Sequence, residues 1–442
     1  MQHSGNRNSA IGGIVRLLGL KPGEFVAVAW SFVYFFSLLS AYYMLRSVRE
    51  AMAIVGGTQN IPWLFTGTFV VMILATPLFG WVASRFPRKQ FLPWVYYFFI
   101  FNILIFFVAF TYAQRNDLET VWIARAFFVW LSVFNLFVVS VFWSFMADIY
   151  SKEQGRRLFG VISAGGSTGA LLGPLLTSVL VVPLGFQNLL PLSAFLLMFS
   201  VYCVAQLRRW SERQPAEDRE DSLDSSRPIG GGALAGVRQV LTSPFLAAIA
   251  TGGVFASLMG TALYIYMAQL VSETFSTTDQ QTQVFALLDA LTNALALIGQ
   301  LIIVKQVVQR FGIGVSLAVL PIVSIVGFAL LAANPVFIVI AALQVARRSL
   351  TFGLAKPTSD MLYTVVSPEE KYKAKNFIET ALYRGGDLVG AWGVRMMAGL
   401  GLGLSGISLV CIPIAAIWTV IALWLGKDYK RRDKAISEGR NV

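Results

Sequence analysis

Long apolar runs, separated by short polar stretches, repeat along the whole chain. Runs near or beyond 18 residues are long enough to cross the hydrocarbon core of a bilayer as α-helices. The pattern therefore predicts an all-α, polytopic membrane protein with twelve transmembrane helices. These spans are expected near residues 25–47, 62–84, 91–112, 121–146, 158–183, 187–207, 244–271, 281–304, 313–333, 335–356, 376–400 and 404–425.

One long polar stretch divides the spans into two groups of six. It is rich in Arg, Asp and Glu and holds three consecutive glycines, so it cannot bury a core and predicts a flexible linker. The expected segments are a tail at 1–24 with a short interfacial helix, a six-helix bundle at 25–207, the linker at 208–242, a second six-helix bundle at 243–426 and a tail at 427–442.

The distribution of basic residues predicts the orientation of the chain. If the N-terminus is cytoplasmic, nearly all loop Lys and Arg fall on the cytoplasmic side, and Arg115 is the main basic residue on the other. Because cytoplasmic loops carry an excess of Lys and Arg, both termini and the linker are expected in the cytoplasm. The first apolar run is too long for a signal peptide, so the expected location is a bacterial inner membrane without a cleaved leader.

Composition excludes several classes of chemistry. The formal net charge of +12 is expected to face anionic lipid rather than nucleic acid. The single histidine, His3, lies in the polar tail, and Cys203 and Cys411 lie in apolar runs of opposite halves, so neither His-based catalysis nor a disulfide framework or metal cluster is expected. The sequence has no P-loop and no nucleophile paired with a base. We therefore expect a protein that is not an enzyme and needs no cofactor.

Charged residues at the end of the first run are the most informative feature. On a helix, Tyr42, Arg46, Arg49 and Glu50 share one face. A charge near the bilayer centre costs about 2.5–3.5 kcal/mol. These side chains therefore either face a water-filled cavity and bind a charged ligand, or lie in the headgroup region because the helix has already left the membrane.

Later spans also carry polar side chains, and the basic ones outnumber the acidic ones. A bound anion would offset the cost of surplus cations, so an anionic small-molecule substrate is expected, which Arg forks suit well. Tyrosines could stack on a planar ring, or simply pack in the core or an interfacial belt. Arg384 and Asp387 could pair with each other, and Arg125 and Arg395 could snorkel to the interface. The candidate substrate-binding residues are Tyr42, Tyr43, Arg46, Arg49, Glu50, Arg125, Asn135, Asp289, Asn293, Gln344, Arg347, Arg348, Lys356, Glu379, Tyr383 and Arg384.

Two stretches resemble the major facilitator family of transporters. The loop Gly80 to Lys89 is similar to the family's signature after span two, with Ser84 in place of its Asp and Pro87 in place of its second Gly. In span five, the spacing of Gly160, Gly169, Gly173 and Pro174 is similar to the signature of facilitator antiporters, with Thr177 and Ser178 in place of its trailing Gly pair. Glycines four residues apart in this span would allow close helix packing. The resemblance implies two parallel six-helix repeats. Candidate gating residues are Gly80, Arg85, Arg88, Lys89, Asp148, Arg156, Arg157, Gly169, Gly173, Pro174 and Arg310.

Three further stretches resemble a narrower family, the bacterial and plastid ATP/ADP antiporters. They are Leu45-Arg46-Ser47-Val48-Arg49-Glu50, then Phe142 to Asp148 followed by Gly155 to Phe159, and Phe352-Gly353-Leu354-Ala355-Lys356 followed by Tyr372 to Lys375. The resemblance implies a nucleotide bound through intramembrane Lys and Glu. Pro357 stands where that family has a Glu, and Arg49-Glu50 replaces its Lys-Asp, so the chain is expected to be a divergent relative.

The leading hypothesis is a monomeric secondary transporter that exchanges an organic anion, with nucleotides as one candidate class, by alternating access. An alternative is a proton-coupled exporter of amphipathic or lipid-like molecules that uses Glu50, Asp289 or Glu379. A third hypothesis is a membrane scaffold or sensor without transport activity. The expected partners are the substrate and the bilayer.

Overall fold

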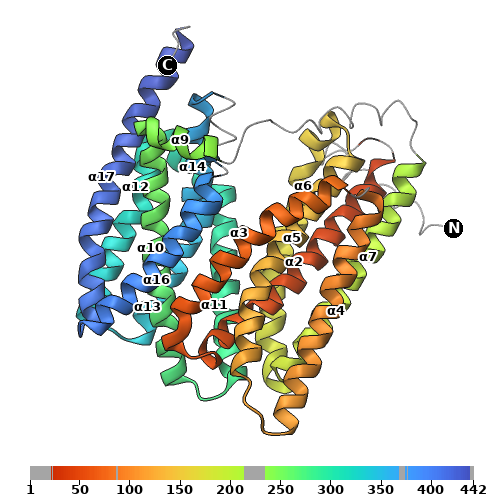
Figure 1. Cartoon of the computed structure of the whole chain (residues 1–442). Helices are drawn as coiled ribbons and strands as arrows, with labels where there is room; N and C mark the ends of the chain where they lie inside the picture. Colours follow the sequence, from red (N-terminus) through yellow and green to blue (C-terminus); the bar gives the residue numbers. More distant parts are fainter. Residues whose placement is uncertain are drawn as a thin grey trace, which may run out of the picture. The chain divides into compact units, whose positions relative to one another are not determined.

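The structure is a computed structural model that describes residues 21, 23–85, 88–213, 234–367, 374–375 and 377–438 (Figure 1). All regular secondary structure in these residues is helical. The long helices are α2 (Glu24–Val55), α3 (Ile61–Arg85), α4 (Arg88–Arg115), α5 (Val121–Ile149), α6 (Lys152–Leu184), α7 (Leu189–Glu212), α10 (Pro244–Thr274), α11 (Thr278–Ile298), α12 (Val304–Ala333), α13 (Phe337–Leu350), α16 (Tyr383–Gly399) and α17 (Leu404–Ser437).

Shorter elements connect or extend these helices. They are the helices α9 (Leu234–Thr242) and α14 (Lys356–Leu362), the 3-10 turns η1 (Thr58–Asn60), η2 (Phe186–Asn188) and η6 (Tyr363–Val365), and the π-helical segments η4 (Gly299–Ile303), η5 (Thr351–Ala355) and η7 (Ile378–Leu382).

Every predicted span coincides with a helix, and the all-α membrane fold is confirmed. Ten helical segments of the described chain are long and apolar enough to cross a membrane. One of them, Thr278–Ala333, covers two predicted spans. The predicted span 376–400 is not among the ten because α16 has only 17 residues and carries Arg384, Asp387 and Arg395. The predicted interfacial helix in the N-terminal tail lies outside the described residues.

The break between the two predicted spans of Thr278–Ala333 is a single residue. Gly312 interrupts α12 with φ 80° and ψ 171°, a conformation that a residue with a Cβ rarely adopts. The sequence predicts a loop between these spans. In the structure, Gly312 is the residue at which the backbone of α12 leaves the helical conformation.

The described helices form two compact units. Unit 1 comprises residues 1–49, 75–123 and 130–228, and unit 2 comprises residues 50–74, 124–129 and 229–442. Unit 2 therefore contains the loop between α2 and α3 together with the six C-terminal spans. At the linker ends, α7 continues to Glu212 and residues 234–242 form α9; the predicted C-terminal tail begins inside α17.

A stripe of glycines brings α6 onto α2 within unit 1. A Cβ on Gly165 would lie 2.4 Å from the backbone oxygen of Phe32, and one on Gly169 would lie 2.4 Å from that of Phe36. A Cβ on Gly173 would lie 2.8 Å from the oxygen of Ser40. The close packing expected from this spacing is confirmed, because only glycine fits at these contacts.

Unit 2 repeats this arrangement between α16 and α10. A Cβ on Gly386 would lie 3.0 Å from the Ser257 side chain, and one on Gly390 would lie 3.1 Å from the Leu258 Cα. The fifth span of each half thus packs through glycines on the first span of the same half. This shared contact supports the expected pair of six-helix repeats.

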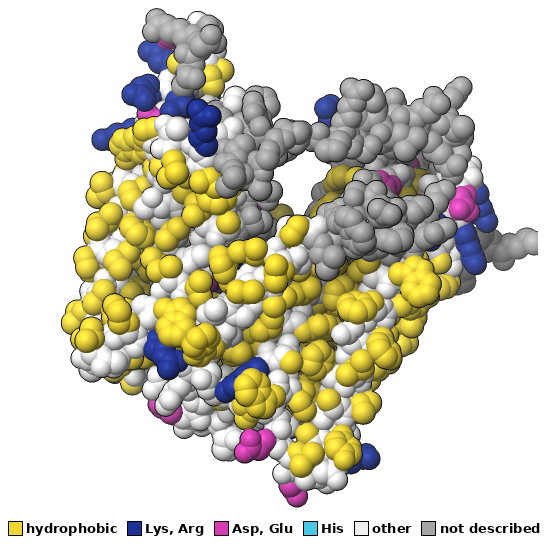
Figure 2. Space-filling view, in the orientation of Figure 1, with side chains coloured by type: hydrophobic (Ala, Val, Ile, Leu, Met, Phe, Trp, Pro, Cys, Tyr) yellow, Lys and Arg dark blue, Asp and Glu magenta, His cyan; other side chains and the backbone are white. Residues whose placement is uncertain are grey.

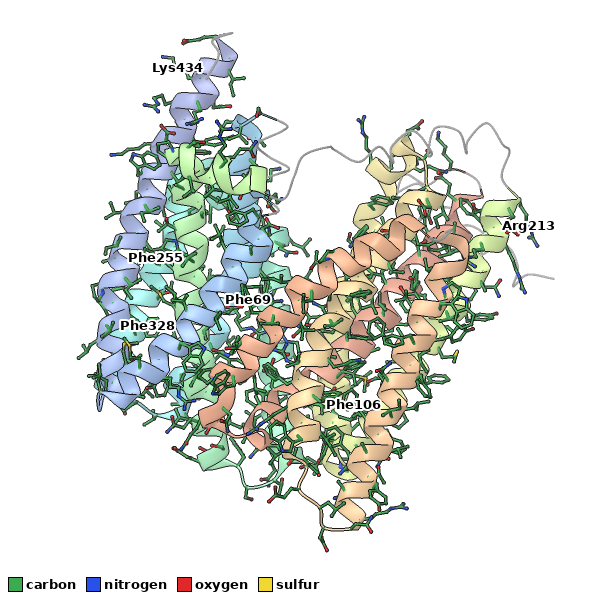
Figure 3. The ribbon with its side chains drawn as sticks, viewed as in Figure 1. Phe69, Phe106, Arg213, Phe255, Phe328 and Lys434 are labelled. Atoms are coloured by element: carbon green, nitrogen blue, oxygen red, sulfur yellow. The ribbon has the colours of Figure 1, made fainter. Side chains whose placement is uncertain are left out.

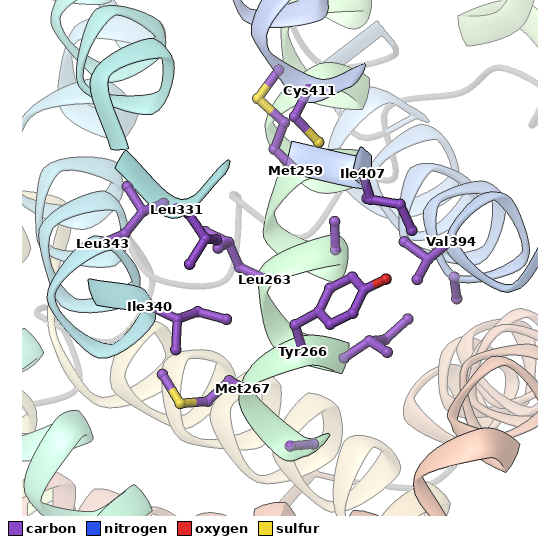
Figure 4. Close-up of a cluster of buried hydrophobic side chains, with 14 of the residues drawn as sticks. Met259, Leu263, Tyr266, Met267, Leu331, Ile340, Leu343, Val394, Ile407 and Cys411 are labelled. Carbon is purple, nitrogen blue, oxygen red and sulfur yellow. The ribbon is translucent and has the colours of Figure 1, made fainter. Parts of the chain in front are cut away.

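The core of unit 2 surrounds α10 (Figure 4). Met259, Leu263 and Met267 are at most 1% exposed. They pack in one cluster with side chains of α12, α13, α16 and α17, among them Leu331, Ile340, Leu343, Val394, Ile407 and Cys411. Large apolar side chains are also exposed on the outer faces, as a bilayer environment requires (Figure 2).

Candidate functional site

A buried charge pair in unit 2 joins α11 to α13. The Arg348 Nη1 lies 2.5 Å from the Asp289 Oδ1, and the Asp289 side chain is 2% exposed whereas that of Arg348 is 22% exposed. Both residues are candidates from the sequence. The contact places a partly exposed arginine side chain beside an enclosed carboxylate.

Arg347, the residue before it, has a different environment. Its side chain is buried, its Nε donates to the Ser324 Oγ at 2.9 Å, and its Nη2 donates to the Ala256 oxygen at 3.2 Å. Its guanidinium lies 6.0 Å from the ring centre of Phe328, a side chain labelled in Figure 3. Among the described residues Arg347 makes no ion pair, so its positive charge is held by neutral oxygens and an aromatic ring.

The first turn of α16 brings further candidates to these arginines. The Asp387 Oδ1 accepts hydrogen bonds from the Ser257 Oγ at 2.5 Å and the Thr261 Oγ1 at 3.2 Å. The Arg384 Nη1 lies 3.6 Å from the Asp387 Oδ2, so the pairing expected as one alternative is present. The Ser257 Oγ also contacts the Tyr383 oxygen at 2.9 Å, and the preceding residue on α10, Ala256, accepts the hydrogen bond from Arg347.

We call this group the arginine cluster: Asp289, Arg347, Arg348, Tyr383, Arg384 and Asp387. Three guanidinium groups face two carboxylates, which leaves an excess of one positive charge. An electron-rich oxygen group such as a carboxylate or phosphate is the ligand that such a cluster suits.

A π-helical turn shapes the chain beside the cluster. In η5 the Lys356 N–H bonds the Thr351 oxygen, five residues back. At the same spacing of five residues, the N–H of residue 357 would donate to the Phe352 oxygen, but Pro357 has no N–H. The Gln300 Nε2 donates to this oxygen instead, at 3.0 Å. Such π segments often occur at functional sites, and the apolar pattern of the sequence does not reveal them.

The same turn allows α13 to approach α11 closely. A Cβ on Gly299 would lie 3.1 Å from the Gly353 Cα, and a Cβ on Gly353 would lie 3.0 Å from the Ala296 oxygen. The two π segments η4 and η5 therefore meet through glycines. This contact fixes the distance between the helices that carry Asp289 and Arg348.

Lys356 and Glu379 meet in a second group, which we call the charge network. The Lys356 Nζ lies 2.5 Å from the Glu379 Oε1 and 2.9 Å from the Asp360 Oδ1, and the Lys375 Nζ lies 2.7 Å from the Asp360 Oδ1. Two cations balance two anions. Sequence reasoning missed Asp360 as a partner and assigned Lys375 only to a loop, because no spacing in the sequence indicates this contact.

The candidates on α2 lie in the interior of a helix. The helix α2 continues to Val55, beyond the span predicted to end near residue 47. Arg46 lies over the Tyr43 ring at 5.6 Å, and the Tyr42 and Tyr43 rings are 5.1 Å apart. Arg46 and Arg49 are half-buried, and Glu50 is 5% exposed.

Two arginines expected to snorkel instead hold the loop after α2. The Arg125 Nε and Nη2 donate to the Gly56 oxygen at 3.0 and 2.9 Å, which caps the C-terminal end of α2. The Arg395 Nη1 donates to the Gln59 oxygen at 3.1 Å, and its guanidinium lies over Trp392. Both side chains have a structural role in this loop.

The remaining candidates are three polar residues and the gating residues. Asn135, Asn293 and Gln344 are half-buried on α5, α11 and α13. Of the gating candidates, Asp148, Arg156 and Arg310 are exposed. Gly80, Arg85, Arg88 and Lys89 flank residues 86–87, and only their backbone belongs to the described structure.

Arg157 contacts a residue that sequence reasoning overlooked. Its Nη2 lies 2.9 Å from the Oε1 of Glu24, which also accepts a hydrogen bond from Gln154 at 3.1 Å. These bonds join the start of α6 to the start of α2. Nearby, the Ser31 Oγ lies 2.8 Å from the Tyr150 hydroxyl, and burial raises the pKa of Tyr150 well above its usual range.

No group of three or more His, Cys, Asp or Glu within the described ranges could hold a metal ion.

Comparisons with known proteins agree with this fold. A family model described as Major Facilitator Superfamily matches residues 25–378. ADP,ATP carrier protein 2 of Chlamydia pneumoniae is 21% identical over 471 aligned residues, which cover 88% of this chain and 86% of that protein.

Solved structures of transporters also share the fold. A bacterial homologue of the iron transporter ferroportin has a TM-score of 0.65 at 12% identity, covering 92% of this chain and 98% of that chain. The nucleoside transporter NupG has a TM-score of 0.55 at 15% identity, covering 92% of this chain and 98% of that chain. At such identities the likeness concerns the fold alone.

Proposed function

This chain belongs to the major facilitator superfamily and is a membrane transporter of that type, and from this premise we propose that it exchanges an organic anion across a bacterial inner membrane. The observation that carries the proposal is the arginine cluster of unit 2. Arg347 is buried without an acidic partner in the described chain, and the Arg348 side chain is partly exposed.

The electrostatics of the cluster favour an anionic ligand. A guanidinium inside a span costs about 2.5–3.5 kcal/mol, and the two carboxylates leave one of the three uncompensated. A carboxylate or phosphate bound to Arg348 would offset this cost through charge-assisted hydrogen bonds. Asp289 then holds Arg348 in place while the ligand is absent, as the 2.5 Å contact indicates.

The same surplus charge favours exchange over net uptake. An empty transporter would carry uncompensated positive charge through its conformational change, whereas a loaded one would be closer to neutral. A ligand shifts a conformational equilibrium only through such a difference in interaction energy. We therefore propose that substrate on the opposite side is needed to return the transporter.

Nucleotides are the first substrate class to test. The Chlamydia pneumoniae relative is an ADP,ATP carrier protein by name, and the stretch from Leu45 to Glu50 resembles that family. Where the family has a Glu after Lys356, this chain has Pro357. Here Lys356 contacts Glu379 and Asp360 instead, so a Lys–Glu pair is retained through a different residue.

The test is uptake into proteoliposomes of radiolabelled ADP, ATP and malate, each with the same unlabelled compound inside. Arg348→Ala should reduce uptake at least tenfold, because it removes the accessible guanidinium. Arg115→Ala is the matched control, since this exposed arginine lies at the end of α4 outside the cluster. Gel filtration and the melting temperature should show that both variants fold.

Normal uptake by Arg348→Ala, or the same loss in both variants, would contradict the anion proposal. Uptake driven by a pH gradient into empty liposomes, lost in Asp289→Asn or Glu379→Gln, would favour the proton-coupled alternative instead.

A further inference from the structure

The last turns of α17 carry a basic face that the transport proposal does not use. This helix has 34 residues and is therefore about 50 Å long at 1.5 Å per residue, whereas a bilayer core needs only about 20 residues. Lys434 lies on the end of α17 that projects beyond its neighbours (Figure 3). Lys427, Lys430, Arg431 and Lys434 are all exposed there.

Three of these basic residues, Lys427, Arg431 and Lys434, continue the face of α17 that is apolar further back, and Lys430 lies beside them. Val410, Ile417, Val420 and Trp424 are between 38% and 67% exposed, and the steps from 410 through 413, 417, 420, 424, 427 and 431 to 434 are all three or four residues. Residues at this spacing lie on one side of a helix. Along this face, apolar side chains that suit acyl chains are followed by Trp424, a residue type common at the membrane interface, and then by basic side chains.

Neighbouring residues of the same turns fix this end of α17 to unit 2. Asp428 is buried and contacts the Arg432 Nε at 2.8 Å and the Arg431 Nη2 at 2.5 Å. Arg432 lies 4.7 Å above the Phe245 ring at the start of α10, and the Tyr429 hydroxyl lies 3.2 Å from the Thr364 Oγ1. The basic face is therefore held in one orientation.

The charge of these basic residues and their position beside the start of α10 both indicate the interface of the bilayer. Lys427 and Lys430 form no ion pair in the described chain. The Lys434 Nζ lies 3.8 Å from the Glu438 Oε1, just beyond the C-terminal end of α17. The contact with Phe245 places these turns level with the start of α10. There α9 exposes Leu241 at 79% while it buries Val240 at 5%, a pattern that suits a helix lying in the interface.

We propose that Lys427, Lys430, Arg431 and Lys434 form a binding surface for the headgroups of anionic phospholipids. The acyl chains would lie along the apolar part of the same face, and the phosphate would meet the lysines. Clusters of basic residues directly beyond a transmembrane helix are suited to anionic lipids. Figure 2 shows basic side chains over the end of α17, next to hydrophobic ones on its flank.

The test uses the full-length protein in neutral detergent. Phosphatidylglycerol and phosphatidylcholine with the same acyl chains are titrated separately, and bound lipid is counted by native mass spectrometry. The wild-type protein should bind phosphatidylglycerol at least tenfold more tightly. Raising NaCl from about 50 to 500 mM should weaken this preference, because salt screens exposed charges.

A triple variant, Lys427→Gln, Lys430→Gln and Lys434→Gln, should lose about a hundredfold in affinity for phosphatidylglycerol, at about fivefold per charge. The matched triple Lys→Arg variant keeps the charge and should bind as wild type does. Glycerol 3-phosphate should not displace the lipid, because it lacks acyl chains.

Equal binding of the two lipids to the wild type, or unchanged binding by the glutamine variant, would overturn the proposal. If the glutamine variant fails to fold, lipid preference and salt dependence of the wild type still decide. Displacement by glycerol 3-phosphate would also overturn it, in favour of a soluble phosphate ligand.

Discussion

At the scale of single residues, the Gln300 side chain supplies a hydrogen-bond donor that the backbone of a neighbouring helix lacks. Its amide donates to the Phe352 oxygen at 3.0 Å, a group that loses its backbone donor because Pro357 has no N–H. An unpaired carbonyl in an apolar environment costs about 1–3 kcal/mol. Gln300 therefore supports the turn that connects Arg348 to Lys356.

We expect Gln300→Ala to lower the melting temperature of the purified protein. Pro357→Ala provides a new N–H for the Phe352 oxygen, so Gln300→Ala should cost less in that background than in the wild type. Gln306→Ala is the control, because this exposed glutamine forms no side-chain hydrogen bond in the described structure. An equal loss in both backgrounds would show that the bond to Phe352 is not what matters.

Residue-level prediction from the sequence succeeded where contacts are local and failed where they are distant. The Arg384–Asp387 pair is three residues apart and could be anticipated. The partners Lys356 and Glu379 were both candidates, but their contact with each other and with Asp360 depends on how α14 meets η7. Arg125 was expected to snorkel because nothing in its sequence neighbourhood indicates the Gly56 oxygen that it caps.

At the scale of helices, the glycine contacts of the first and fifth spans organise both halves. The twelve helices could be predicted because long apolar runs have few alternatives in a bilayer. The π segments could not, since one extra residue in a turn leaves the apolar pattern unchanged. Gly169 is a candidate for gating as well as packing, and that gating role stays a prediction.

Gly169→Ala should destabilise the protein by about 1–3 kcal/mol or more, because its Cβ would meet the Phe36 oxygen at 2.4 Å. Gly160→Ala is the matched control on the same helix, since nothing lies within 4 Å of its Cβ position. It should be neutral or slightly stabilising, because alanine favours helices. Melting temperatures in detergent measure both changes. Equal values for the two variants would mean that α6 does not pack closely on α2.

At the scale of the whole molecule, the predicted orientation rests on the excess of basic residues in alternate loops. Arg213 at the end of α7 and Ser437 at the end of α17 should both face the cytoplasm, and Glu119 between α4 and α5 should not. Substituted one at a time by cysteine, Glu119 alone should react with an impermeant thiol reagent in intact cells. Cys203 and Cys411 are buried and add little background. Reaction at Arg213→Cys or Ser437→Cys would contradict the proposed topology.

The central claim is that the surplus positive charge of the arginine cluster makes this transporter an exchanger of anions. The most direct measurement compares uptake of labelled ADP, ATP and malate into proteoliposomes that contain either the same anion or buffer alone, with and without a pH gradient. We expect internal anion to stimulate uptake of at least one compound at least tenfold, and a pH gradient alone to drive little accumulation. Equal uptake into loaded and empty liposomes, or accumulation that follows the pH gradient, would contradict the account.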